Sequence, residues 1–263
     1  IAWSLLLGTG GFIVFGALSD KIGRKPIILG GCLIAALTFF PIFKMITTNA
    51  NPALEKAIET VKVEVVSDPA LCGDLFNPVG TRVFTAPCDT ARAFLALQSV
   101  KYSTSYGAAG SGVKIVVNGK DVPYTAAAAS NPQVLAAVQA AGYPKAGDAQ
   151  IVKMAHPFDI FRAQPAAIIG LLLVLVIFVT MVYGPIAAML VELFPTRIRY
   201  TSMSLPYHIG NGWFGGLLPA TAFAIVASTG DIYAGLWYPV IFAAITVVVG
   251  FFFLPETKDR DIH

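Results

Sequence analysis

Charged side chains are scarce in this sequence. Only 13% of its 263 residues are Asp, Glu, Lys or Arg, and 56% are hydrophobic, whereas about a quarter of a typical soluble domain is charged. The mean hydropathy is +0.71. This composition argues against a soluble globular protein and favours a membrane protein.

Long apolar runs account for the imbalance. A bilayer core of about 30 Å needs roughly 20 mostly apolar residues in a helix. Five segments satisfy this requirement: residues 1–18, 27–47, 164–189, 201–228 and 233–254. The first run has neither the basic start nor the cleavage site of a signal peptide. The sequence does not begin with Met, and we expect the chain to be a fragment that begins inside a helix.

Short enzyme motifs are also missing from the sequence. It contains no P-loop pattern, no H-E-x-x-H pair and no G-x-S-x-G turn, and the apolar spans hold no paired acidic motif. We therefore expect a protein that is not an enzyme, with no catalytic residues, no cofactor, no metal site and no nucleic-acid partner.

The positions of Lys and Arg predict how the spans are oriented. The cations of the short connections lie in the turns at 20–26 and 194–200 and in the tail: Lys21, Arg24, Lys25, Arg197, Arg199, Lys258 and Arg260. The loop at 229–232 carries Asp231 and no cation. Because Lys and Arg in short loops mark the cytoplasmic side, we expect these turns and the C-terminus to be cytoplasmic.

Residues 49–160 differ from the rest and resemble a small soluble domain, which this topology places outside. The alternation at 60–66 predicts a strand, and Asn118-Gly119 between apolar runs predicts a hairpin over 113–124. The predicted fold is an all-α polytopic membrane protein with a small α+β insert. Its expected domains are 1–48, 49–160 and 161–263.

Two helices are expected in this insert. Asp89 is a candidate N-cap for a helix over 90–98. An alanine-rich segment at 132–141 predicts a second helix, which ends at Gly142.

Cysteine is rare, and two of the three, Cys72 and Cys88, fall in the insert, while Cys32 lies in the second span. In an oxidising compartment such a pair is expected to form a disulfide. Two free buried thiols are the alternative. A zinc site is disfavoured because the only histidine of the insert, His156, lies at its far end.

The turn GALSDKIGRKP at 16–26 is more specific than a solvated loop requires. Asp20 is placed to pair with Arg24 or to accept hydrogen bonds from a helix start. Gly23 permits a tight bend, and Pro26 suits the first turn of the next helix.

This G-x-x-x-D-x-x-G-R-K pattern resembles the signature loop of the major facilitator superfamily. ELFPTRIR at 192–199 and FLPETK at 253–258 resemble two further motifs of its sugar porters. Their order resembles helices eight to twelve of twelve, with helix seven and the whole N-terminal half missing. YHIGNGWFGGLLP at 207–219 is most similar to metabolite–proton symporters, which include carriers of shikimate, 2-oxoglutarate, proline and betaine. The resemblance does not cover the insert, and Asp259 replaces the usual sugar-porter Gly.

The resemblance implies a cytoplasmic gate made of charged residues at the helix ends. Ion pairs would join these ends when the cavity opens outward and separate when it opens inward, while one half of the protein rocks against the other. The gate residues are Asp20, Gly23, Arg24, Glu192, Arg197 and Arg199.

Polar residues concentrate in the fourth span. An ionisable residue inside a membrane span is a functional hypothesis, and His208 lies three residues before Asn211, on the same helix face. The two offer a donor and acceptor to a carboxylate, and His208 offers a titrating proton. The alternative is a hydrogen bond from His208 to a neighbouring helix.

Three aromatic residues complete the predicted substrate and proton pathway. Tyr207 and Trp213 line it or serve as packing aromatics, and Tyr183 stands beside Gly184-Pro185 at a possible kink of the third span. We expect a proton-coupled symporter of a small polar metabolite, an organic acid or a zwitterion, that works by alternating access.

The alternatives are a sugar or polyol facilitator, a membrane-anchored external binding module and a membrane-embedded enzyme. The expected partners are the substrate, protons, the bilayer and the missing N-terminal half. The expected location is a bacterial inner membrane, with the insert in the periplasm. Three roles stay open for the insert from the sequence: filtering of substrate, binding of a partner, or neither of these.

Overall fold

The computed structural model describes residues 1–78, 83–126, 131–145 and 151–259. It divides into two compact units. The first contains residues 1–49, 153–217 and 238–263, and the second contains residues 50–152 and 218–237. Arg260, one of the cations in the predicted tail, lies outside the described residues.

Five helical segments are long and apolar enough to cross a membrane, as the sequence predicted: Ala2–Ile22, Arg24–Ala50, Ala163–Leu193, Arg199–Thr229 and Ala234–Phe253. Four of them extend past at least one predicted end, because polar end residues continue the helix without adding to the apolar run. With the small sheet described below, they confirm the predicted fold class.

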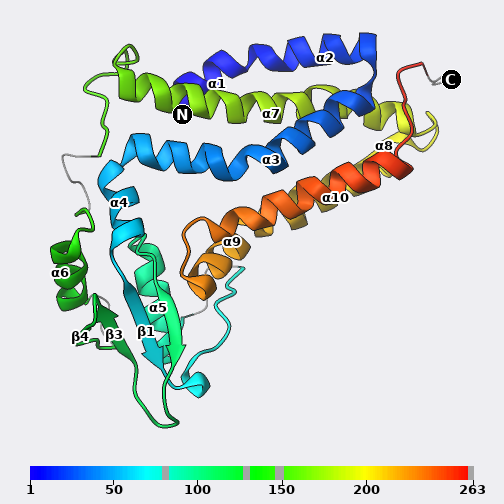
Figure 1. The fold of residues 1–263 in the computed structure, drawn as a ribbon. Helices are drawn as coiled ribbons and strands as arrows, with labels where there is room; N and C mark the ends of the chain where they lie inside the picture. Colours follow the sequence, from blue (N-terminus) through cyan, green and yellow to red (C-terminus); the bar gives the residue numbers. More distant parts are fainter. Residues whose placement is uncertain (79–82, 127–130, 146–150, 260–263) are drawn as a thin grey trace. The chain divides into compact units, whose positions relative to one another are not determined.

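Three of these segments, the first, the fourth and the fifth, consist of more than one helical element; Figure 1 labels α1 and α2 of the first. The first consists of α1 (Ala2–Gly8) and α2 (Gly10–Ile22), and the second and third are α3 (Arg24–Ala50) and α7 (Ala163–Leu193). The fourth begins as α8 (Arg199–His208), widens into the π-helical segment η2 (Ile209–Gly215) and ends as α9 (Gly216–Thr229). The fifth contains η3 (Ala234–Leu236) and α10 (Trp237–Phe253).

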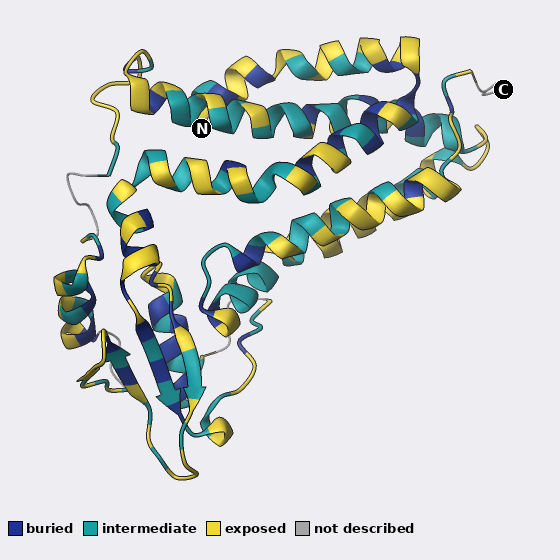
Figure 2. Ribbon diagram, in the orientation of Figure 1, coloured by how far each residue is buried: buried dark blue, intermediate teal, exposed yellow. Residues whose placement is uncertain are grey.

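Glycine permits close packing between the helices of the first unit. A Cβ added to Gly8 would meet Val176 of α7, and one added to Gly11 would meet Thr180, its hydroxyl nearest. Small residues at such positions let membrane helices approach closely. The outward faces of the spans are largely exposed (Figure 2), as expected of surfaces that meet lipid.

The second unit is built on a four-stranded sheet in the order β2-β1-β3-β4. Its strands are β1 (Val63–Ser67), β2 (Ser103–Tyr106), β3 (Lys114–Val117) and β4 (Lys120–Val122). The pair β1–β2 is parallel, and the pairs β1–β3 and β3–β4 are antiparallel. Helices α4 (Pro52–Thr60), α5 (Pro87–Leu97) and α6 (Pro132–Ala141), with the short turn η1 (Pro69–Leu71), complete the insert. Alternate residues of β1 enter the core, where Val65 is fully buried.

Two predictions for the insert are confirmed. The hairpin β3–β4 turns at Asn118 (φ 48°) and Gly119 (φ 81°), as a two-residue turn with positive φ requires. The helix α6 has the predicted bounds and ends at Gly142, whose φ is 126°.

Two other predictions for the insert are correct only in part: the strand and the helix are present, but the start of the strand and the cap of the helix differ. The strand begins at Val63 and not at Thr60, because Thr60 is the last residue of the amphipathic helix α4. Asp89 does not cap α5, since the helix already begins at Pro87, a residue suited to a first helical turn. Instead Asp89 is buried and accepts a hydrogen bond from the Gly73 backbone N–H at 2.8 Å.

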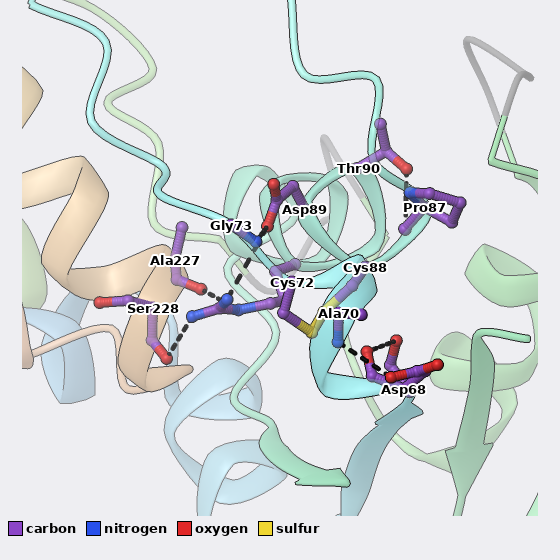
Figure 3. The surroundings of a disulfide bond; sticks show 12 residues. Asp68, Ala70, Cys72, Gly73, Pro87, Cys88, Asp89, Thr90, Ala227 and Ser228 are labelled. Carbon is purple, nitrogen blue, oxygen red and sulfur yellow. Dashed lines mark hydrogen bonds and ion pairs between the residues drawn. A yellow bond between two sulfur atoms is a disulfide. The ribbon is translucent and has the colours of Figure 1, made fainter. Parts of the chain in front are cut away.

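The structure contains a disulfide between Cys72 and Cys88 (Figure 3), with a Cα–Cα distance of 5.0 Å. It joins the loop after η1 to the first turn of α5. Cys88 is fully buried. The bond therefore anchors a loop without regular structure to a core helix.

Replacing both Cys72 and Cys88 with Ala is expected to raise the rate of proteolysis of the insert about 100-fold in the detergent-solubilised full chain. Closing a loop of this length, 16 residues, stabilises by about 3 kcal/mol in the entropic model, and cleavage follows the population of open states. Cys32→Ala, which removes a thiol of α3, is the control. Equal cleavage rates in the double variant and the control would contradict a stabilising role.

Candidate functional site

A buried arginine lies where α2, α3 and α7 come together. Gly23 separates α2 from α3, and Arg24 is the first residue of α3. The Arg24 guanidinium donates to the Asp20 carboxylate, to Ser19 Oγ at 2.6 Å and to Glu192 Oε1 at 3.0 Å. Only 9% of the Arg24 side chain is exposed. The Arg24 side chain therefore joins the last turn of α2 and the start of α3 to the end of α7.

The two acidic partners of Arg24 differ in burial. The Glu192 side chain is 16% exposed, and it also accepts from the Thr257 hydroxyl at 2.6 Å. The Asp20 side chain is 62% exposed. Exposed ion pairs are worth about 0–1 kcal/mol, whereas removing one partner of a buried pair costs about 3–5 kcal/mol. The Arg24–Glu192 pair is therefore the main electrostatic contact.

Glu256 of the C-terminal tail is a third acidic residue at this place, and sequence reasoning missed it. Its carboxylate accepts hydrogen bonds from the backbone N–H groups of Arg24 (2.9 Å) and Lys25 (3.0 Å), the first two residues of α3. The N–H groups of Thr257 and Lys258 donate to it as well. The first turn of α3 has no acidic residue of its own, and this deficit was a usable signal because a helix N-terminus favours a negative charge.

Burial alone would raise the pKa of Glu256, but the backbone donors from Arg24, Lys258, Thr257 and Lys25 outweigh it and lower the pKa. A carboxyl with a lowered pKa contributes stability that is present above its ordinary pKa of about 4.3 and is lost as the pH falls further. The cap at α3 therefore stays charged throughout the physiological range.

The tail and its neighbours complete what we name the Arg24 cluster: Ser19, Asp20, Gly23, Arg24, Glu192, Glu256, Thr257 and Lys258. Thr257 is fully buried, and the Lys258 ammonium donates to the Lys21 carbonyl at 2.8 Å. The structure does not bring the other predicted gate cations into the cluster. Arg199 Nε donates to the Phe194 carbonyl, and Arg197 is exposed, with no ion pair to any residue that the structure describes.

Gly23→Ala is expected to weaken the cluster by about 1–3 kcal/mol, because Gly23 has φ 108°, which L side chains rarely adopt. The new Cβ would also fall against the Glu256 carboxylate. Thermal unfolding in detergent measures the effect. Gly30→Ala, in α3 where an added Cβ meets no described atom within 4 Å, is the control. Equal melting temperatures for the two variants would show that the turn does not need glycine.

The second polar site lies in the fourth span, where the helix widens at η2. The Tyr183 hydroxyl of α7 donates to Asn211 Oδ1 at 2.9 Å, and Asn211 Nδ2 donates to the Tyr207 carbonyl at 3.0 Å. Tyr238 of α10, another residue that sequence reasoning missed, donates to the Phe214 carbonyl at 2.9 Å. A π-helical turn alters the backbone hydrogen-bond ladder and is frequent at functional sites. The neighbouring tyrosines here supply bonds across the helices.

The remaining predicted pathway residues lie around η2 without joining this hydrogen-bonded set. The His208 ring contacts the ring of Tyr207 edge-on, with centroids 5.8 Å apart, and its side chain makes no hydrogen bond to Asn211 or to another described residue. Trp213 is 72% exposed. No residue in the most apolar window of this span is buried within the described chain. Polar and ionisable side chains within membrane spans mostly face the interior of the helix bundle or a water-filled cavity.

No group of three or more His, Cys, Asp or Glu side chains that could hold a metal ion occurs among the residues with described positions. The chemistry available at both sites is ion pairing and hydrogen bonding.

Comparison with known proteins gives matches over part of the chain. Residues 150–263 match the family model described as "Sugar (and other) transporter". Two Haemophilus influenzae proteins named as metabolite transport proteins are similar. One is 41% identical over 81 residues, 30% of this chain and 17% of the relative. The other is 29% identical over 115 residues, 43% of this chain and 25% of the relative.

A third relative is the glycine betaine/proline/ectoine/pipecolic acid transporter OusA of Dickeya dadantii. It is 32% identical over 99 residues, which are 36% of this chain and 19% of the relative. The matches span 17% to 25% of the lengths of these relatives. No solved structure matches the chain.

Proposed function

Since residues 150–263 match the family model of the sugar (and other) transporters, we propose that this chain is a member of the major facilitator superfamily and forms part of a secondary transporter, a proton-coupled symporter of a small polar metabolite. The family is one of transporters, in agreement with the expectation of a protein that is not an enzyme.

The Arg24 cluster is the observation that carries this proposal. A buried guanidinium links α3 to the end of α7, and a carboxylate of the tail lies on the start of α3; we propose that this contact is formed in one state of the transport cycle and separated in the other. Alternating access requires such contacts at the helix ends on one side of the membrane. A network of pairs is enough to shift two states that differ by a few kcal/mol.

The polar segment at η2 is proposed to line the substrate and proton path. The hydroxyl of Tyr183 and the amide of Asn211 supply a donor and an acceptor, held in place by their mutual hydrogen bond. His208 supplies an ionisable side chain within the span. Tyr207 and Trp213, both largely exposed, would offer aromatic faces to a cationic or apolar part of the solute.

The proposed substrate is a small zwitterion or organic acid. One relative is named as a transporter of glycine betaine, proline, ectoine and pipecolic acid. A sugar or polyol facilitator is the second candidate, favoured by the name of the matched family. The same proposal places the Arg24 cluster and the C-terminus in the cytoplasm and the insert, residues 49–160, in the periplasm of a bacterial inner membrane. It also assigns a separate N-terminal half to the whole transporter.

The test is uptake of labelled glycine betaine, proline, 2-oxoglutarate and glucose by cells that express the natural gene for this chain, at pH 5.5 and 7.5. The proposal predicts uptake of a zwitterion or an organic acid that is faster at the lower pH. His208→Gln is predicted to flatten this pH dependence. Uptake of glucose alone, without pH dependence, would favour the facilitator, and uptake of none of the four solutes would contradict the proposal.

A further inference from the structure

The insert holds the carboxyl end of the fourth span. The last residues of α9 and the loop that follows belong to the same compact unit as the insert. In Figure 3, Ala227 and Ser228 lie beside α5, close to the disulfide. These residues end the helix that follows η2 without a break in the chain.

Arg92 of α5 makes the main contact. Its Nε donates to the Ala227 carbonyl at 3.1 Å and its Nη2 donates to the Ser228 carbonyl at 2.8 Å. Arg92 is 7% exposed, and Asp89 Oδ1 lies 3.9 Å from its Nη1. The last carbonyls of a helix have no partner within the helix, and a cation there is favoured by the helix dipole.

Tyr102 adds a second donor to the same end. Its hydroxyl donates to the Ala227 carbonyl at 2.5 Å, and its backbone N–H donates to the Gly230 carbonyl at 3.0 Å. Burial raises the pKa of Tyr102, so its hydroxyl stays protonated and able to donate. Gly230 has φ 74°, and an added Cβ would collide with the Tyr102 carbonyl.

The contact continues past the helix end. The Tyr233 hydroxyl donates to Glu55 of α4 at 2.6 Å, and Ile232 packs against the core of the insert. Ala227 also joins a small buried cluster with Leu75 and Ala93. The loop between the fourth and fifth spans is thus part of the folded insert.

We propose that Arg92 is a positioning residue for transport, which fixes the carboxyl end of the helix that carries the η2 segment. This inference rests on the proposed function. Arg92 pairs with Asp89 within the insert, and it also directs two of its nitrogens to carbonyls of a membrane span. The Cys72–Cys88 bond lies at the start of the same helix, next to Asp89, and holds α5 in place behind Arg92.

Two measurements on the product of the natural gene test this role. The first is the turnover number, the maximal rate of glycine betaine uptake divided by the number of glycine betaine binding sites. Counting sites removes any loss of folded protein. The second is hydrogen exchange of the backbone amides at 226–236. Arg92→Gln is expected to lower turnover about tenfold and to speed exchange at 226–236, with little change in substrate affinity.

Tyr102→Phe keeps the ring in the core and is expected to give a smaller change in the same direction. Lys114→Gln, which removes an exposed cation of the insert, is the matched control and should change neither quantity. Unchanged exchange at 226–236 in Arg92→Gln would overturn the inference, and so would faster exchange with normal turnover. If the wild type takes up substrate and Arg92→Gln changes neither turnover nor exchange, the inference is overturned and the proposed function is not. No wild-type uptake of any tested solute would overturn the proposed function together with the inference.

Discussion

Arg24→Ala is expected to lower the maximal rate of uptake by roughly two orders of magnitude, at unchanged expression. The substitution leaves the Glu192 carboxylate, 16% exposed, without its guanidinium partner. Removing one partner of a buried ion pair costs about 3–5 kcal/mol, and each 1.4 kcal/mol corresponds to about a tenfold change in an equilibrium or a rate. The state in which the helix ends are joined would become too sparsely populated for efficient cycling.

Lys21→Gln is the matched control for this variant. It removes a cation three residues earlier in the same turn, whose side chain is exposed. The two variants are compared by initial uptake rates per copy in the membrane. Equal rates for Arg24→Ala and Lys21→Gln would mean that the burial of the cluster has no role in transport. Arg24→Lys is expected to be intermediate, because a single ammonium does not reproduce the planar fork of arginine.

Asn211→Leu is expected to lower uptake about tenfold or more, mainly through a higher KM. Asn211 joins Tyr183 of α7 to the Tyr207 carbonyl at the start of the widened turn. Leucine removes both hydrogen bonds, each worth about 0.5–1.5 kcal/mol net. A site that holds a polar solute by hydrogen bonds loses affinity strongly when one of the bonding groups is absent.

Asn49→Leu provides a close control, because Asn49 Nδ2 also donates to the carbonyl four residues earlier, that of Met45, within its own helix. Tyr183→Phe removes only the hydroxyl of the other partner and should reproduce part of the Asn211 effect. A KM in Asn211→Leu equal to that of Asn49→Leu would contradict a role for η2 in substrate binding.

Membrane spans were the most predictable part of the fold, since their signal is composition over about 20 residues. The hairpin at Asn118-Gly119 and the stop at Gly142 were predictable because glycine and asparagine meet a specific backbone demand there. The strand β2 was not foreseen. Its residues Ser103–Tyr106 are polar and show no alternation, and their place depends on pairing with β1.

The two polar sites were predictable only in part. Asp20, Arg24 and Glu192 stand in motifs that resemble a known family, and the structure places them together. Glu256 was missed because it caps a helix start 232 residues away in the chain. Arg92 and Tyr238 were also missed. Each donates to a main-chain carbonyl far away in the chain, and such a contact leaves no pattern in the sequence.

We propose that the helix ends around Arg24 separate during transport. The direct test introduces the substitutions K21C and K258C in a Cys32→Ala background. In the native protein the Lys258 ammonium lies 2.8 Å from the Lys21 carbonyl. A reducible thiol cross-linker then joins the two cysteines, and the same background without them controls for the reductant. The account predicts that the cross-link stops uptake and that reduction restores it. Uptake by the cross-linked protein at the rate of the free protein would contradict the account.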